Sequence, residues 1–304
     1  MKIKFEKGKN YHIPFNKEVK LKIYKDFKEV IYVSHKTNNL KDLKPRKGNK
    51  FVNIKTDEIK IYTPTGEFKS NKSLKRTLDG RVKDLLINNF GGGHTEKFLT
   101  LTFDNIAINF NDLTRMINNF WKRLKRYCNK RNLSLICIYV KEVHKSGNWH
   151  IHLLLKEINN KTLFINIDDL KKIWKYGGVH INPVSSKKDN SDKEINIEKE
   201  ISEGFAGKTH SFNKLVDYMC KLHSKENVIP SRGRVYGTKG NLQLPKSKNK
   251  LYGEACNTDL KYDYLDSEDT LLVRNAETNS IVNNIHKERW IENKPNNSNN
   301  LSKL

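Results

Sequence analysis

Two histidines are the side chains in this sequence whose type and spacing best suit metal chemistry. His150 and His152 stand one residue apart in the run GNWHIHLLL, which has the composition of a β-strand. Side chains two positions apart on a strand point to the same face, so the two imidazoles lie side by side. Imidazoles placed in this way are a pair of metal ligands. The spacing alone also fits two partly exposed polar residues, so a third ligand is needed to decide.

Glu142 supplies a third ligand. It ends the preceding apolar run, across a predicted hairpin turn near Ser146 and Gly147, and antiparallel pairing can bring its carboxylate beside the imidazoles on one sheet face. Two histidines and a carboxylate with open positions suit a catalytic Mg²⁺ or Mn²⁺, and also Zn²⁺. His144, one strand period from Glu142, is the alternative ligand. We favour Glu142 because a metal that handles phosphate prefers oxygen.

Tyr218 is the candidate nucleophile. It lies in SFNKLVDYMCKLHSKE, where helical spacing gathers Lys214, Lys221 and Lys225 beside it on the polar face. A single tyrosine on a helix usually packs in a core, but three flanking lysines favour a different role. A phenol is a poor nucleophile, and adjacent cations and a metal ion that polarises the electrophile lower the cost of using its oxygen. The buried stripe of this helix is predicted to be Phe212, Leu215, Val216, Met219 and Leu222.

The elements that position these residues follow from hydrophobic periodicity. A helical segment over residues 71–90 ends at GGGH, and an amphipathic helix begins near Asn111. Strands are predicted over 96–103, 133–143, 148–156 and 178–184, with a further helix over 166–178. The order β-α-β-β-α-β predicts an α+β fold: a ferredoxin-like or split-βαβ antiparallel sheet with helices packed on one or both faces.

Composition divides the chain into three parts. Residues 1–70 read as a basic N-terminal extension with short strands, and residues 71–250 as the main domain, with a mobile insertion at about 185–210. Residues 251–304, which end in KPNNSNNLSKL, are expected to be a largely disordered C-terminal tail.

The net charge of +24, from 58 basic and 34 acidic residues, points to a polyanionic partner. Residues 259–304 hold six basic and eight acidic residues, so the excess lies in the first 258. Nucleic acid is favoured over membrane, because the sequence has no apolar run of the ~20 residues that span a bilayer. We therefore expect a cytoplasmic protein. The four cysteines lack CxxC spacing, which favours reduced thiols over a disulfide framework or a zinc site.

Three motifs in order resemble the rolling-circle replication initiators, or Rep proteins, of the HUH endonuclease superfamily, of the single-tyrosine type found in plasmids and single-stranded DNA phages. FLTLTF at 98–103 resembles the first motif, HIHLLL at 150–155 the His-hydrophobic-His motif, and Tyr218 with Lys221 in YMCK the YxxK motif. Glu142 stands where several members keep a third ligand. The resemblance covers roughly residues 70–245.

The resemblance implies a site-specific, metal-dependent endonuclease and strand transferase acting on single-stranded origin DNA. Tyr218 would form a 5′-phosphotyrosine link and release a 3′-hydroxyl primer, a Mg²⁺ or Mn²⁺ ion at His150, His152 and Glu142 would polarise the phosphate, and Lys221 would steady the reacting groups. No second tyrosine accompanies Tyr218, which leaves termination open. The sequence has no GxxxxGK[ST] motif, so a host helicase is implied as a partner alongside DNA polymerase. The oligomeric state stays open.

The remaining DNA-binding surface is a weaker prediction. Arg232, Arg234, Tyr236 and Lys239 mix basic and aromatic residues after the catalytic helix, as strand-tracking surfaces do, although a solvated loop fits equally well. Lys214 and Lys225 are further candidates. Two alternatives stay open. One is an HUH relaxase or transposase with the same chemistry; the other is a non-enzymatic DNA-binding plasmid regulator, for which Tyr218→Phe would leave every activity intact.

Overall fold

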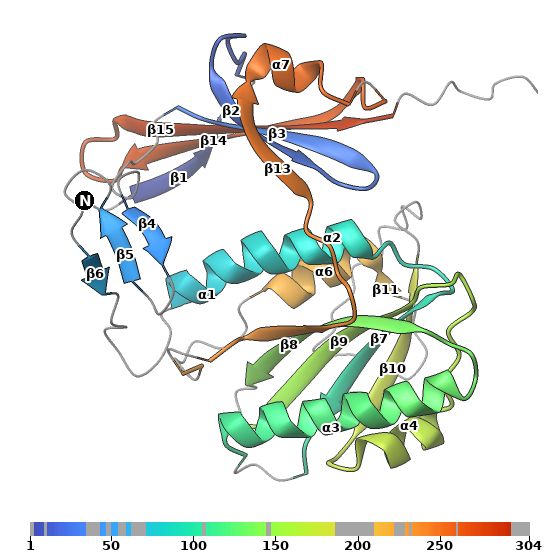
Figure 1. Cartoon of the computed structure of the whole chain (residues 1–304). Coiled ribbons are helices and arrows are strands. Elements are labelled where there is room, and N and C mark those ends of the chain that lie inside the picture. Colours follow the sequence, from blue (N-terminus) through green and yellow to red (C-terminus); the bar gives the residue numbers. More distant parts are fainter. Residues whose placement is uncertain are drawn as a thin grey trace, which may run out of the picture. The chain divides into compact units, whose positions relative to one another are not determined.

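The chain folds as two units in the computed structural model, Met1–Thr63 with Pro245–Leu304 and Pro64–Leu244 (Figure 1). The structure describes residues 3–8, 11–34, 43–46, 50–53, 59–61, 71–104, 108–143, 147–185, 210–221, 229–230, 233–259 and 261–292. We call Pro64–Leu244 the central unit and the other the terminal unit.

The central unit is built on a six-stranded sheet of order β11-β10-β7-β9-β8-β12. Its pairs are antiparallel except for the short parallel pair of β10 and β11. The strands are β7 (Glu96–Thr102), β8 (Leu135–Val143), β9 (Trp149–Glu157), β10 (Val179–Ser185), β11 (His210–Ser211) and β12 (Tyr236–Lys239). The two middle strands, β7 and β9, are buried along most of their length, since helices cover both faces of the sheet.

Helices pack on both faces of this sheet (Figure 1). On one face lie α1 (Asn71–Thr77), the π-helical turn η1 (Leu78–Val82), α2 (Lys83–Asn89) and α6 (Phe212–Cys220); on the other lie α3 (Phe110–Asn129) and α4 (Ile167–Trp174). The side chain of Asn109 caps α3 by accepting from the backbone N–H groups of Asn111 and Asp112, and Asn166 caps α4 in the same way. The order β7-α3-β8-β9-α4-β10 confirms the predicted α+β arrangement.

The glycine-rich connection before β7 is fixed by a buried carboxylate. Glu96 accepts hydrogen bonds from the backbone N–H groups of Gly91 and Gly92 and pairs with Lys156. Burial raises the pKa of Glu96, while the Lys156 ammonium and the two N–H groups act against that rise. Gly92 and Gly93 have positive φ values of 76° and 96°, which other residues adopt at a cost. This connection joins α2 to the strand that runs beside the histidines.

The terminal unit corrects the predicted domain boundaries. Its six-stranded sheet has the order β1-β14-β15-β3-β2-β13, so strands from the two ends of the chain pair with one another at three places. The strands are β1 (Ile3–Lys7), β2 (Glu18–Ile23), β3 (Phe27–Val33), β13 (Lys246–Leu251), β14 (Tyr264–Asn275) and β15 (Ile281–Ile291), with α7 at Tyr252–Cys256. Three further strands, β4 (Leu43–Arg46), β5 (Lys50–Asn53) and β6 (Ile59–Ile61), pair with one another.

The prediction of a largely disordered tail over 251–304 was therefore wrong for residues 252–256, 264–275 and 281–291. The N-terminal and C-terminal segments form one sheet together, since β1 pairs with β14, β3 pairs with β15, and β2 pairs with β13. Both ends of the chain contribute to one core, in which Val30 and Tyr32 of β3 pack with Tyr252 and Ala255. Residues 245–250, assigned to the main domain by composition, belong to the terminal unit.

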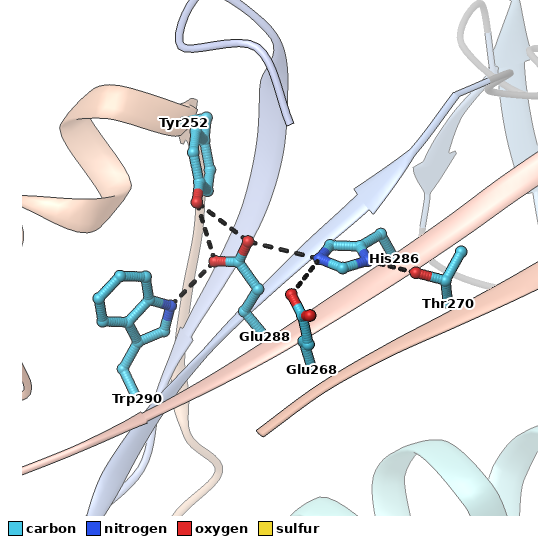
Figure 2. Close-up of polar contacts among 6 residues, drawn as sticks. All are labelled: Tyr252, Glu268, Thr270, His286, Glu288 and Trp290. Carbon is cyan, nitrogen blue, oxygen red and sulfur yellow. Dashed lines mark hydrogen bonds and ion pairs between the residues drawn. The ribbon is translucent and has the colours of Figure 1, made fainter. Parts of the chain in front are cut away.

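A buried polar network lies within the terminal unit (Figure 2). The Tyr252 hydroxyl donates to both carboxylate oxygens of Glu288, at 2.9 and 3.2 Å, and the Trp290 indole donates to one of them. His286, fully buried, contacts the Thr270 hydroxyl through Nδ1 at 2.6 Å, and its Nε2 lies 3.4 Å from Glu288 and 3.9 Å from Glu268. Burial and the Glu288 charge raise the pKa of Tyr252, so its hydroxyl keeps the proton it donates.

Two of the predicted segments include residues that the structure does not describe. They are the insertion at about 185–210, of which 186–209 lie outside the described residues, and the chain end from 293 onward. Among the described residues, no helix is long and apolar enough to cross a membrane. All four cysteines carry free thiols, as expected, and burial raises the pKa of Cys128 to about 11 and those of Cys137 and Cys220 to about 12.

Candidate active site

The predicted ligands lie on neighbouring strands in direct register. Glu142 on β8 is paired with His150 on β9, and Val140 is paired with His152. On the other side of β9, His152 is paired with Thr100 on β7. Residues opposite one another in antiparallel strands share a face, so Glu142, His150 and His152 all belong to the face covered by α2 and α6. The hairpin thus brings the three residues together as the sequence predicted.

His152 is held by two oxygen-bearing side chains. Its Nδ1 lies 3.1 Å from the Thr100 hydroxyl, and its Nε2 lies 2.7 Å from Oε2 of Glu142. The imidazole is 2 % exposed and stacks on Phe98 with ring centroids 5.8 Å apart. In the contact present, Nε2–H donates to the Glu142 carboxylate and Nδ1 accepts from Thr100, whereas a metal ligand requires the other tautomer, in which Nδ1–H donates to Thr100 and the Nε2 lone pair is free.

The donor set suits a divalent cation, but the side chains do not converge in the geometry present. Within the residues that the structure describes, no group of three or more His, Cys, Asp or Glu side chains is arranged to hold a metal ion. The rings of His150 and His152 have centroids 6.3 Å apart and lie at 73° to each other. Glu142 and His152 touch directly, so a metal ion bound by both would have to separate them. Two imidazoles and a carboxylate on one face nevertheless fit Mg²⁺ or Mn²⁺ chemically.

Tyr218 meets this cluster from the helix α6. Its hydroxyl lies 3.3 Å from Nε2 of His152, and its ring packs edge-on against His152 and Phe98, at centroid distances of 5.1 and 6.4 Å. The helix is fixed on the sheet by its buried stripe, which leaves Tyr218 half-buried. That stripe contains Phe212, Leu215, Val216, Met219 and Cys220, and the predicted member Leu222 lies outside the described residues. The structure therefore brings the predicted nucleophile to Nε2 of His152, the nitrogen that Glu142 also contacts.

Tyr218 also lines a cleft of about 430 Å³ that is rich in lysine. Each aspartate of the cleft pairs with a lysine, Lys75 with Asp79 at 3.1 Å and Lys83 with Asp217 at 2.9 Å. Burial lowers the pKa of Lys83, but the hydrogen bond and charge of Asp217 outweigh it, and the net pKa is raised. Four lysines against two aspartates leave the cleft positive. Its walls contain the side chains of Lys75, Asp79, Lys83, Lys214, Asp217, Tyr218, Cys220 and Lys221.

Lys75 and Lys83 were not among the predicted site residues. They come from α1 and α2, and Lys83 stands 134 positions before its partner Asp217. Both reach the cleft because η1 and α2, which continue from α1, pack against α6. A signal was present in the sequence, since SLKRT and GRVKD place basic residues on a helix with a separate apolar stripe. That pattern is common on solvated helices, so it does not single them out.

The weaker DNA-binding predictions lie elsewhere. Arg234, Tyr236 and Lys239 line a second cleft at β12, and none of them lines the lysine cleft. Lys239 donates to the Asn118 side chain at 2.6 Å. Lys214 and Lys221 do line the lysine cleft beside Tyr218. His144, Lys225 and Arg232 lie outside the described residues.

Comparison with protein families gives a match that covers this site. Residues 96–227 match the family model described as Replication-associated protein ORF2, which supports a replication initiator family for this chain. The matched region runs from β7 through α6 and contains Glu142, both histidines and Tyr218. No curated protein and no solved structure matches the chain.

Proposed function

We propose that this chain is a rolling-circle replication initiator of the single-tyrosine HUH type that cuts and rejoins single-stranded origin DNA through Tyr218. The observation that supports it best is the 3.3 Å contact between the Tyr218 hydroxyl and Nε2 of His152. Neither residue type is unusual alone, but a phenol oxygen, an imidazole nitrogen and a carboxylate oxygen meet beside a lysine-rich cleft. The match of residues 96–227 to a replication-associated family supports the replication-initiator part of this proposal.

In the proposed reaction the Tyr218 oxygen attacks the phosphorus of a DNA phosphodiester. The bond from phosphorus to the tyrosine oxygen forms as the bond to O3′ breaks, which leaves a 5′-phosphotyrosine and a free 3′-hydroxyl. The phenol proton passes to water, and the departing O3′ takes a proton from water. The lysines of the cleft hold the phosphate backbone and stabilise the negative charge that develops on the reacting oxygens. Reversal of the same step with another 3′-hydroxyl rejoins ends.

His150, His152 and Glu142 would hold the divalent ion, Mg²⁺ or Mn²⁺, which when bound supplies Lewis-acid polarisation of the phosphate. Thr100 keeps the His152 ring oriented through its contact with Nδ1. Phe98 and Tyr218 enclose that ring and limit the access of water to it. Host helicase and DNA polymerase would act on the opened origin and extend the 3′-hydroxyl primer.

The test is a covalent-adduct assay with labelled single-stranded fragments of the chain's own replicon and Mn²⁺, read on a denaturing gel. Wild-type protein is expected to form an adduct that Tyr218→Phe, which keeps the ring and its packing, does not form. Tyr176→Phe is the matched control, because Tyr176 is half-buried in the same unit and lines neither cleft. It should form the adduct at the wild-type level.

Two outcomes would overturn the proposal. One is adduct formation by Tyr218→Phe at the wild-type level. The other is the absence of adduct from wild-type protein with every fragment tested; origin binding without an adduct would then indicate a non-enzymatic regulator.

A further inference from the structure

The second cleft of the central unit lies on the sheet face opposite the candidate active site. It has a volume of about 800 Å³, within the range of small-molecule sites. Side chains alternate along β8, so Tyr139 and Lys141 face away from Glu142 and toward α3 (Figure 1). The first turn of α3, the strands β8 and β12 and the segment Gly233–Arg234 form its walls. The proposed reaction does not use this cleft, although the predicted DNA-binding residues Arg234, Tyr236 and Lys239 line it.

The walls of this cleft carry an excess of positive charge. Lys141, Arg234 and Lys239 are the cations, and Asp112 is the carboxylate. Asp112 is already engaged, since it pairs with Arg115 at 2.8 Å and accepts from the Asn109 side chain. The Lys141 ammonium donates to Thr114 at 2.8 Å and lies 4.0 Å from the centre of the Phe110 ring. An anionic group is therefore the ligand that the wall chemistry favours.

The hydroxyl of a buried tyrosine also lines this space. Tyr139 is 5 % exposed, and its hydroxyl has no hydrogen-bond partner among the described residues. The Tyr139 oxygen is not among the fully buried, unpaired polar atoms of the described residues, so the hydroxyl is open to the cleft and can donate to a ligand there. The Tyr139 ring extends over β12 at Gly237, where an added Cβ would overlap the hydroxyl oxygen. Glycine at 237 keeps that space open for the phenol, which lines the cleft as a donor.

We infer that this cleft is a nucleotide-binding site in which the Tyr139 hydroxyl, Lys141 and Arg234 hold a phosphate group. The cleft is larger than a phosphate needs, and Phe110 adds an aromatic surface to its wall, so the ligand carries a base or sugar as well. Two sources share this chemistry: a stretch of the single-stranded DNA that passes around the edge strand β12, or a free nucleotide. The first source rests on the proposed function, and the second does not.

The test measures binding to the full chain in EDTA, where no cutting occurs, so that failure of the nuclease proposal would not affect it. The two probes are dTMP and a fluorescent oligothymidylate. The oligothymidylate has about twenty nucleotides, which is longer than the DNA that one binding site for single strands covers. Tyr139→Phe removes one oxygen and is expected to weaken binding about tenfold, as loss of a hydrogen bond to a charged group does. Arg234→Gln, at an exposed position, should lower the salt dependence of oligonucleotide binding by about one ion.

Matched controls are Tyr176→Phe and Lys125→Gln, which make the same chemical changes outside both clefts. Weaker oligonucleotide binding by the cleft variants alone assigns the site to the DNA strand. Weaker dTMP binding with unchanged oligonucleotide binding assigns it to a free nucleotide. Wild-type affinity of both variants for both probes overturns the inference. Ultraviolet cross-linking of an iododeoxyuridine oligonucleotide should, for the strand source, label peptides that contain Phe110 or Tyr139.

Discussion

The hydroxyl of Tyr218 lies 3.3 Å from Nε2 of His152, although the two residues stand on a helix and a strand that are 66 positions apart in the sequence. Glu142 reaches the same nitrogen from the neighbouring strand at 2.7 Å. A ring nitrogen carries either one proton or one lone pair, so the carboxylate and the phenol oxygen compete for a single hydrogen-bonding position at Nε2. A cation bound by Nε2 and Glu142 would remove this competition. The contact therefore links the predicted nucleophile to the proposed metal ligands.

Thr100→Val is expected to weaken metal binding while leaving the three proposed ligands in place. The substitution keeps the shape of a 2 % exposed side chain but removes the oxygen that contacts Nδ1 of His152. Loss of such an outer partner typically costs about 10- to 100-fold in metal affinity. Calorimetric titration with Mn²⁺ measures this, with Thr238→Val on the exposed edge of β12 as the control. Equal Mn²⁺ affinity of Thr100→Val and wild type would show that the hydroxyl does not orient the ligand.

Lys221→Gln should weaken single-stranded DNA binding and lower its salt dependence by about one released ion. Lys221 is exposed at the end of α6 and lines the cleft beside Tyr218. The matched control is the double variant Lys83→Gln with Asp217→Asn, which removes a salt-bridged pair and leaves the net charge unchanged. Filter binding over a range of salt concentrations gives both slopes. The cleft would be no DNA surface if Lys221→Gln kept the wild-type slope.

Much of the central unit follows from periodicity that is local in the sequence. The face of α3 with Leu113, Ile117, Phe120 and Leu124 is buried as its spacing predicts. The strands β8 and β9 are joined by a short turn, and their hydrophobic pattern and this turn fix the pairing register. For this reason the sequence could place Glu142 beside His150. The predicted buried stripe of α6 left out Tyr218, and Tyr218 is indeed not among the buried residues of this helix.

The terminal unit shows where such reasoning fails. The first six residues of β14 are all exposed, so half of the strand has no alternation of buried and exposed side chains to detect. Its partner β15 follows it directly, but its other partner β1 comes from the opposite end of the chain, as the ion pair of Glu6 with Arg274, 268 positions apart, illustrates. Pairing over such a separation leaves no local trace. The lysine cleft was not predicted from the sequence for the same reason, because Lys83 meets Asp217 only when α2 and α6 are packed together.

Lys28→Met should show a stability defect that grows as the pH rises. Lys28 is fully buried and donates to the backbone carbonyls of Cys256 and Thr258 at 2.6 and 3.0 Å. Burial lowers its pKa below the ordinary 10.5, so the folded state releases the proton at a lower pH than the unfolded state does. The unfolded state then binds more protons, and wild-type stability rises with pH up to about 10.5.

Urea unfolding of both proteins at a series of pH values, followed through the protection of β3 and β15 peptides from hydrogen exchange, measures this difference. The methionine at position 28 does not titrate, so the variant lacks the rise that Lys28 gives to the wild type. A gap between wild type and Lys28→Met that is constant with pH would contradict the expectation.

Tyr252→Phe should destabilise the terminal unit by about 1–3 kcal/mol, the usual cost of leaving a buried acceptor unsatisfied. The variant removes the hydroxyl that donates to both oxygens of Glu288, and that carboxylate is 4 % exposed and cannot turn to water. Trp290 still donates one bond, which limits the loss. Urea unfolding followed through protection of β15 gives the value. Tyr264→Phe, whose side chain is 54 % exposed, is the control and should stay within about 0.5 kcal/mol of wild type.

Removal of residues 259–304 is expected to unfold the terminal sheet, because β14 and β15 stand between β1 and β3 in its strand order. Without them β1 has no pairing partner within the described residues, and β3 keeps only β2. The matched control is removal of residues 293–304 alone, which leaves both strands intact. Hydrogen exchange should show lost protection of β2 and β3 in the longer deletion and wild-type protection in the shorter one. Equal protection in both would mean that the N-terminal strands fold without the C-terminal ones, as the composition of the chain had suggested.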